Sequence, residues 1–144
     1  MRVSQILTGK GSDVFAITPQ HTVGQLIHEL AEHKVGALLV RDGDGAIAGI
    51  VSERDVVRAL ASGESIVNEP VASIMTSQVV TVSQDADVSD LMRLMTERRI
   101  RHVPVLDNDA LLVGMVSIGD VVKNRIDELE SERAALVDYI TQGG

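Results

Sequence analysis

The 144-residue chain contains no cysteine, no tryptophan, and only one phenylalanine and one tyrosine. The missing cysteines exclude disulfides, thiol catalysis and thiolate metal sites, and two aromatic rings offer little surface on which single-stranded bases could stack. Basic residues are outnumbered by acidic ones, 13 to 21, and the formal net charge of −8 opposes non-specific binding to nucleic acid or anionic membrane. The apolar runs are far shorter than the ~20 residues that cross a bilayer. We therefore expect a cytoplasmic protein with an aliphatic core and no nucleic-acid or membrane partner.

The main feature of the sequence is an internal repeat. The segment GIVSERDVV at residues 49–57 returns as GMVSIGDVV at residues 114–122, an offset of 65. A shorter pair of similar segments, residues 3–8 and 71–76, repeats at an offset of 68; we call these the leader segments. The sequence predicts two copies of one unit, residues 1–65 and 66–125, and a C-terminal helical extension over residues 126–144.

Each copy has the same predicted order of elements, β-α-β-β-α, from its hydrophobic periodicity and turn residues. The first strand, the central strand and the third strand are predicted over residues 14–17, 37–40 and 47–51 in the first copy, and 79–82, 103–106 and 111–116 in the second. The fold class is thus α/β (α+β). A unit of about 60 residues is marginally stable alone, so we expect the two copies to pack sheet to sheet about a pseudo-two-fold axis.

Three motifs resemble binding sites but have the wrong spacing. Gly9-Lys-Gly-Ser12 lacks the hydroxyl residue that directly follows GK in a phosphate-binding loop. The acidic segment at residues 42–45 lacks the sixth-position glycine of a calcium loop and is predicted as a hairpin turn. His28 and His33 would lie about 140° apart on a helix, too far around to share a metal, and are interpreted as solvated. We predict no metal site, no catalytic residue and no enzymatic activity.

The repeated Gly-φ-Val-Ser-x-x-Asp segment, in which φ is apolar, has two compatible interpretations. In the first, Ser52 and Ser117 cap the following helices, with Asp55 and Asp120 completing capping boxes. In the second, the backbone N–H groups at the turn attract anionic oxygen, and the carboxylate accepts the two hydroxyls of a ribose. The residues by themselves leave both interpretations open.

Together with the leader segments and Arg101-His-Val-Pro-Val105, these motifs resemble a tandem pair of cystathionine-β-synthase (CBS) domains, a Bateman module, over residues 3–125. The resemblance implies clefts between the repeats that bind an adenosyl ligand: AMP, ADP, ATP, NAD(H) or S-adenosylmethionine. It implies that Asp55 and Asp120 hold the ribose, with Ser52 and Ser117 close by. The remaining residues that it assigns to the walls of the clefts are Ile17, Thr18, Pro19, Val35, Gly36, Ala37, Val82, Ser83, Arg101, His102, Val103 and Pro104.

Basic residues near the motifs are the candidates for binding a ligand phosphate. Arg101 and His102 begin the central strand of the second copy, Arg54 lies inside the first Ser-x-x-Asp, and Lys10 follows the first leader segment. Arg93 and Arg98 are interpreted as part of a solvated helix face. Because Gly36-Ala37 replaces Arg101-His102 in the first copy, we expect the two clefts to differ.

The C-terminal extension carries a heptad-like seam. Val122, Ile126, Leu129, Leu136 and Ile140 follow alternating four- and three-residue steps if position 133 fills the gap. The seam favours a homodimer, and the alternative is a helix that folds back on its own module. We therefore expect a stand-alone CBS-pair regulator that acts on an unknown protein partner in trans, or alternatively a dimeric structural adaptor with unoccupied clefts.

Overall fold

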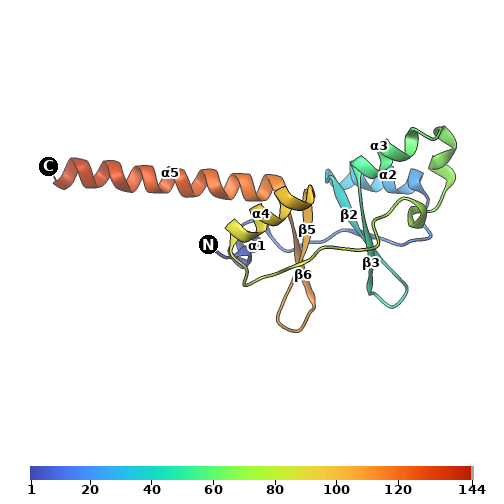
Figure 1. Ribbon diagram of the computed structural model, residues 1–144, viewed down its shortest axis with the longest axis horizontal. Helices are drawn as coiled ribbons and strands as arrows, with labels where there is room; N and C mark the ends of the chain where they lie inside the picture. The colour runs from blue at the N-terminus through green and yellow to red at the C-terminus, as the bar shows by residue number, and fades with distance from the viewer. Residues whose placement is uncertain (144) are drawn as a thin grey trace. The chain divides into compact units, whose positions relative to one another are not determined.

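The protein is described by a computed structural model over residues 1–143, and its contacts divide the chain into two compact units. Residues 14–80 form the first-repeat unit; residues 1–13 and the chain from Thr81 onward form the second-repeat unit. Figure 1 colours the chain from blue to red, so the second-repeat unit combines the dark-blue start with the yellow-to-red part. The sequence repeat and the packing of the chain therefore divide the molecule at different residues.

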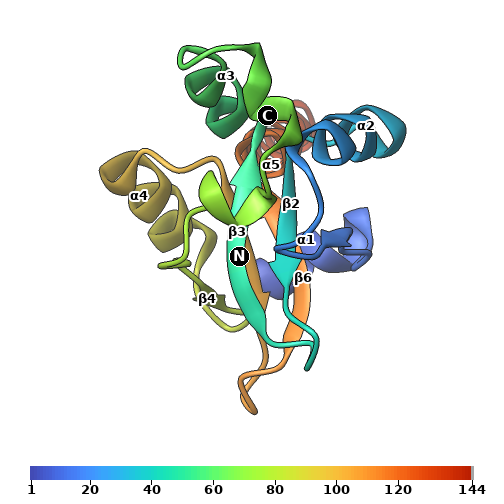
Figure 2. The ribbon, with the colours of Figure 1, turned by 90° about the vertical axis from the view of Figure 1, so that its right-hand side faces the viewer.

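The first-repeat unit is a three-stranded sheet with two α-helices. Its elements are β1 (Ala16–Ile17), α2 (Val23–His33), β2 (Ala37–Arg41), β3 (Ile47–Ser52), α3 (Glu53–Leu60) and two short 3-10 helices, η1 (Glu64–Asn68) and η2 (Val71–Ser73). The sheet order is β1-β2-β3, with β1 parallel and β3 antiparallel to β2. Figure 2 shows α2 and α3 beside the end of β2 and β3 that lies away from the hairpin turn.

The second-repeat unit repeats this plan. Its elements are α1 (Val3–Lys10), β4 (Val82–Ser83), α4 (Val88–Arg98), β5 (His102–Leu106), β6 (Leu112–Ser117) and α5 (Ile118–Gly143). The sheet order is β4-β5-β6, again with one parallel and one antiparallel pair. The predicted β-α-β-β-α order is confirmed in both units. The first strands are shorter than predicted, because only two residues of each pair with the central strand.

Each unit has its own aliphatic core. Leu26, Leu38 and Val51 are among the buried residues of the first-repeat unit, and Leu91, Met95 and Val103 are among those of the second. The side chains come from one face of the sheet and from the inner face of the helices, as the 2.0 and 3.6 periodicities of the sequence require. Packing of these apolar surfaces supplies most of the stability of each unit.

The leader segments are exchanged between the repeats. The first leader forms α1 and joins the body of the second repeat, where Val3 N–H donates to the carbonyl of Ala86 at 2.9 Å. The second leader joins the body of the first repeat, where Val71 N–H donates to the carbonyl of His21 at 2.7 Å. These two hydrogen bonds join equivalent positions of the two repeats, so the exchange is reciprocal.

Two of the motifs whose spacing does not fit a metal site have structural roles. Asp42 Oδ1 accepts hydrogen bonds from the N–H groups of Asp44 and Ala46, at 2.9 and 3.1 Å, which confirms a hairpin turn. The solvated interpretation of His33 is wrong: its ring stacks on Phe15, with 3.8 Å between centroids, and its Nε2 lies 3.0 Å from Glu29 Oε2. Within residues 1–143, no cluster of three acidic or histidine side chains is placed to hold a metal ion.

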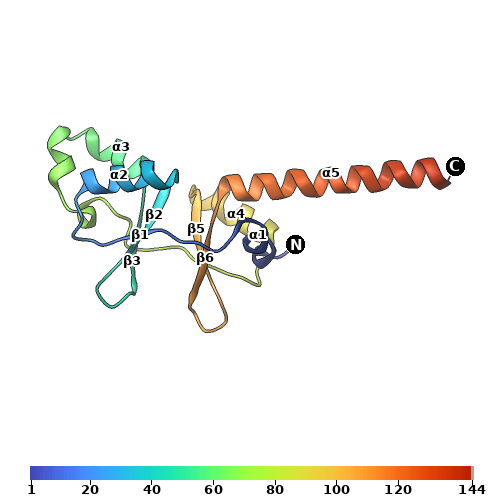
Figure 3. The ribbon, with the colours of Figure 1, turned by 180° about the vertical axis from the view of Figure 1, so that it is seen from behind.

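The C-terminal extension continues the last helix of the second repeat. The helix α5 passes through residues 125 and 126 without a break and runs to Gly143. Figure 3 shows its outer half extending past α1 and α4, the two helices of its own unit that flank its first turns. Over the described part of the chain, no helix is long and apolar enough to span a membrane.

Candidate functional site

The two repeated motifs form strand-to-helix corners. In the first corner, between β3 and α3, Ser52 N–H donates to Asp55 Oδ2 at 2.8 Å and Asp55 N–H donates to Ser52 Oγ at 3.4 Å. In the second corner, between β6 and α5, Ser117 N–H donates to Asp120 Oδ2 at 2.8 Å and Asp120 N–H donates to Ser117 Oγ at 3.2 Å. The capping-box interpretation is confirmed at both corners, and each box places a hydroxyl and a carboxylate at a helix N-terminus.

A lysine from the exchanged leader reaches the second corner. Lys10 Nζ donates to Asp120 Oδ2 at 2.7 Å and to the carbonyl oxygen of Met115 at 2.8 Å. Both charged side chains are partly shielded, with 34 % of Lys10 and 23 % of Asp120 exposed. Burial raises the pKa of Asp120, but the hydrogen bonds from Lys10 and Ser117 outweigh burial and lower it below its usual value. The carboxylate is therefore held ionised and oriented.

The first corner is braced by backbone atoms instead. Its counterpart of Met115 is Ile50, whose carbonyl accepts from the backbone N–H of Thr76 at 2.9 Å, while Thr76 returns a bond of the same length to Ile50 N–H. The residue at the leader position of Lys10 is Gln78. The two corners therefore differ in a contact that the residues of the central strands do not reveal.

The starts of the central strands, which carry the candidate wall residues Gly36, Ala37, Arg101 and His102, lie beside the corners. Ala37 is the register partner of Ser52, and Glu53 N–H donates to the carbonyl of Gly36 at 3.0 Å. In the other unit, His102 is the register partner of Ser117, and Ile118 N–H donates to the carbonyl of Arg101 at 2.8 Å.

The segments before the first helices are not brought to the corner of their own unit. Ile17 pairs with Val40, three residues and roughly 10 Å along β2 from Ala37, and Thr18 and Pro19 follow it. In the other unit, Val82 and Ser83 pair with Val105 and Leu106 at the far end of β5. Thr18 N–H donates to His21 Nδ1 at 3.1 Å, and Ser83 Oγ accepts from Asp85 N–H at the same distance.

Several predicted wall residues belong to the cores. Ile17 is 4 % exposed and Val103 is fully buried; Ala37 and Pro104 are buried as well. Ile17 and Val103 are packed in the cores of their units, where they support the strands that carry the corners. Val35 is half-buried.

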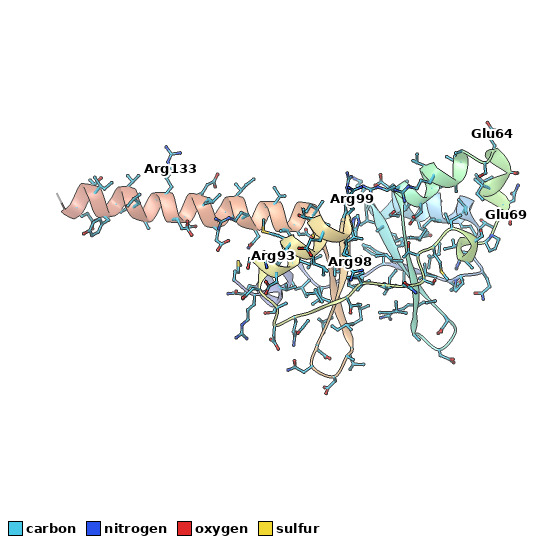
Figure 4. All side chains as sticks on the ribbon, in the orientation of Figure 1. Glu64, Glu69, Arg93, Arg98, Arg99 and Arg133 are labelled. Atoms are coloured by element: carbon cyan, nitrogen blue, oxygen red, sulfur yellow. The ribbon has the colours of Figure 1, made fainter. Side chains whose placement is uncertain are left out.

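Two arginines of the second repeat lie on α4. Figure 4 shows Arg93 and Arg98 on this helix, and both are exposed, in agreement with a solvated face. Arg101 is also exposed and directly precedes β5, and Arg54 is exposed in the first turn of α3. Both arginines stand within two residues of a corner serine or its strand partner.

An apolar groove of about 440 Å³ lies next to the first corner, between α2 and α3. Ile27, Val35, Gly36, Glu53 and Val57 are among the residues that line it. Sequence reasoning placed Val35 and Gly36 at the ligand site but missed the groove. Its signal was present in Ile27 and Val57, apolar residues that remain exposed on amphipathic helices.

Comparison with known proteins identifies the family to which both repeats are similar. The CBS domain family model matches residues 3–62 and 71–127. The chain is 38 % identical to the mitochondrial CBS domain-containing protein CBSX3 of Arabidopsis thaliana, over 99 % of this chain and 72 % of that protein. Among solved structures, a CBS-domain containing protein from Agrobacterium tumefaciens is 42 % identical with a TM-score of 0.84, over 86 % of this chain and 92 % of that one.

A second solved structure was determined with a ligand. A CBS domain protein from Pyrobaculum aerophilum, complexed with AMP, is 29 % identical with a TM-score of 0.74, over 83 % of this chain and 89 % of that one. The matched residues include both corners and both leader segments. This chain therefore belongs to the CBS domain family and carries two CBS domains in tandem.

Proposed function

We propose that this chain is a regulatory CBS-pair protein of the cytoplasm that binds an adenosyl ligand at its repeated Ser-x-x-Asp corners. The ligand is AMP, ADP, ATP, NAD(H) or S-adenosylmethionine, and its occupancy is passed in trans to a protein partner by a homodimer of the chain. The observation that carries the proposal is the Ser-x-x-Asp corner, built twice with the same hydrogen bonds. The AMP complex of the Pyrobaculum relative supports the class of ligand.

The corner chemistry suits a ribose. Each carboxylate oxygen offers two lone pairs, so Asp120 can accept ribose hydroxyls while it continues to accept Ser117 N–H. The lowered pKa keeps the carboxylate in its accepting form. The same arguments from geometry apply to Asp55 and Ser52 at the first corner.

The phosphate would lie near the basic residues of the second corner. Lys10 Nζ is already within 2.7 Å of the carboxylate that would hold the ribose, and a compact ammonium binds phosphate as a point charge. Arg101 and His102 begin the strand beside Ser117. We propose Lys10, Arg101 and His102 as the phosphate contacts of the second site, and Arg54 as the contact of the first.

A structural adaptor with unoccupied clefts is the second candidate. It is favoured by the closed capping boxes, since Asp55 and Asp120 already stabilise the helices α3 and α5 without any ligand. In that case the motif would be maintained for helix capping alone.

Calorimetric titration with AMP, ADP, ATP, NADH and S-adenosylmethionine distinguishes the two functions. We expect at least one of these ligands to bind, and Asp120→Asn to weaken binding at the second corner about tenfold, because a neutral amide replaces the charged acceptor of the ribose hydroxyls. The cost of the same substitution in unfolding free energy should be only about 1 kcal/mol, that of a weakened cap.

The matched variants are Asp55→Asn, which tests the first corner, and Glu97→Gln, which removes one exposed carboxylate from α4 far along the chain from either motif. Glu97→Gln should bind like the wild type. If no adenosyl ligand binds the wild type, or if both aspartate variants keep full affinity, the adaptor function replaces the sensor.

A further inference from the structure

The outer part of α5 exposes an apolar seam. Every described residue from Leu129 to the end of the helix is exposed, and the seam residues are between 47 and 64 % exposed: Val122, Ile126, Leu129, Leu136 and Ile140. Figure 1 shows no other element of the second-repeat unit beside the outer half of the helix. The helix does not fold back on its own unit.

An unsupported helix of this kind is unfavourable in water. A free segment of about 14 residues is marginally helical by itself, and a contiguous apolar stripe on a protein surface marks an interaction site. The steps between seam residues alternate between three and four, the 3.5-residue repeat of a two-stranded coiled coil rather than of a helix on a globular surface. The pattern therefore requires a second helix with the same repeat.

We infer that α5 pairs with α5 of a second copy of the chain as a parallel, in-register coiled coil. Ile126, Arg133 and Ile140 take the a positions, and Val122, Leu129 and Leu136 take the d positions. Val122 and Ile126 lie near the folded unit but each remains 49 % exposed, so the seam is open along its whole length. This pairing defines the interface of the homodimer proposed above, and it rests on the proposed function only for the existence of that homodimer. It does not require a bound ligand.

The charges beside the seam favour the parallel arrangement. Arg125 at a g position faces Glu130 at the following e position of the second copy, and the symmetry repeats this pair. Arg133 meets Arg133 of the second copy at the same a layer, and Glu132 at the preceding g position of each copy lies next to this pair and offsets the repulsion. Figure 4 shows Arg133 extending from a stretch of α5 with no other element of its unit nearby, so its seam position is open to a second helix.

Antiparallel arrangements place the same charges badly. Centred on the middle of the seam, two antiparallel helices would set Glu130 against Glu130 and Glu132 against Glu132, both repulsive. A shift that brings Lys123 opposite Glu130 would carry Leu136 and Ile140 past the start of α5 and along β6 of the second copy. These apolar residues would then have no seam to enter.

Disulfide cross-linking tests the arrangement directly, because the chain has no cysteine of its own. Leu136→Cys places two thiols at one d layer of a parallel pair, and we expect a disulfide-linked dimer to form at least ten times faster than with Ser131→Cys, which lies on the outer face. Equal rates for the two variants, or cross-linking of neither, would overturn the parallel seam.

Light scattering separates this inference from the proposed function. The wild type should be a dimer, and Leu129→Asp combined with Leu136→Asp should raise its dissociation constant at least tenfold, whereas Ser131→Asp should not. A double variant that dimerises like the wild type shows that the dimer uses another face, which overturns the seam and leaves the homodimer standing. A monomeric wild type would contradict both the α5 seam and the homodimer of the proposed function.

Exchanging the charges of Arg125 and Glu130 measures the contribution of this ion pair to dimer stability. Arg125→Glu and Glu130→Arg should each weaken the dimer several-fold, and the two substitutions together should restore it. Arg125 also lies 3.5 Å from Glu128 of its own helix, so the single variants alone do not decide the question. A combined variant that is weaker than both single variants would contradict the parallel register.

Discussion

The two strand-to-helix corners share one sequence pattern but are braced by different groups. At the first corner, Ile50 exchanges two backbone hydrogen bonds of 2.9 Å with Thr76 of the adjoining leader. At the second, the equivalent carbonyl, that of Met115, accepts from Lys10 Nζ, which also binds Asp120. Backbone bonds do not depend on side-chain identity, whereas the lysine makes the second corner sensitive to charge.

This difference shows how a duplicated fold can specialise without changing its strands. Both leaders approach the same glycine of their partner repeat, yet the first forms the eight-residue helix α1 and the second forms only a short 3-10 turn and a β-bridge. Because α1 ends at Lys10, the helix carries a charged side chain to a place that the shorter turn leaves to backbone atoms. The asymmetry therefore originates in the leaders and not in the Ser-x-x-Asp motifs.

The largest effect is expected where the leaders meet the corner glycines. A Cβ at position 49 would lie 2.7 Å from the carbonyl oxygen of Thr76, while a Cβ at position 114 would lie 2.7 Å from a terminal methyl carbon of Leu7. A backbone oxygen cannot turn aside as a leucine side chain can, so Gly49→Ala should cost about 3 kcal/mol of unfolding free energy and Gly114→Ala about 1 kcal/mol. Urea unfolding measures both, and equal or reversed costs would contradict the comparison.

A smaller effect is expected from the lysine. Lys10→Met removes a charge-assisted hydrogen bond to a partly buried carboxylate, and should lower the unfolding free energy by about 1 kcal/mol. Its matched control is Gln78→Met at the equivalent, exposed position of the other leader, which should change stability by less than about 0.5 kcal/mol.

The lysine variant also sharpens the proposed function. If Lys10 contacts a ligand phosphate, Lys10→Met should reduce the affinity for AMP and leave that for adenosine unchanged, measured by calorimetry. A parallel loss for both ligands would assign the lysine to the structure of the corner alone.

The smallest expected effect is the loss of the Lys10–Asp120 contribution to stability at acid pH. The pKa of Asp120 is lowered in the folded chain, so its ion pair stabilises the fold above the usual aspartate value and this contribution is lost as the pH falls through that value toward the folded pKa. The stability difference between the wild type and Lys10→Met should therefore be full at pH 7 and decrease below about pH 4. Urea unfolding at both pH values checks this, and a difference that is constant with pH would show that Lys10 acts through packing.

Much of the fold follows from local patterns. The strands β2, β3, β5 and β6 fall within one residue of the predicted positions, because their apolar residues repeat with a clear period. The first strands were predicted less well. Residues 79–81 are apolar or β-branched but do not pair, since an edge strand is defined by the neighbour that it meets and not by its own composition.

The candidate site, too, could be predicted only in part from the sequence. The capping boxes follow from the three-residue spacing of serine and aspartate, which a helix start converts into contact. The stacking of His33 on Phe15 was not predictable, because it depends on which residue of a neighbouring segment a helix face meets.

The order of elements, the duplication and the heptad seam were already determined by the sequence alone, because each is a periodicity that recurs within a few residues or at one constant offset. Only the tertiary structure decided that the leaders cross to the opposite repeats and that Lys10 meets Asp120, 110 residues away. Such a pairing has no local signature: it depends on where two elements far apart in the chain come to lie, and this is set by the fit of α1 against β6 and α5.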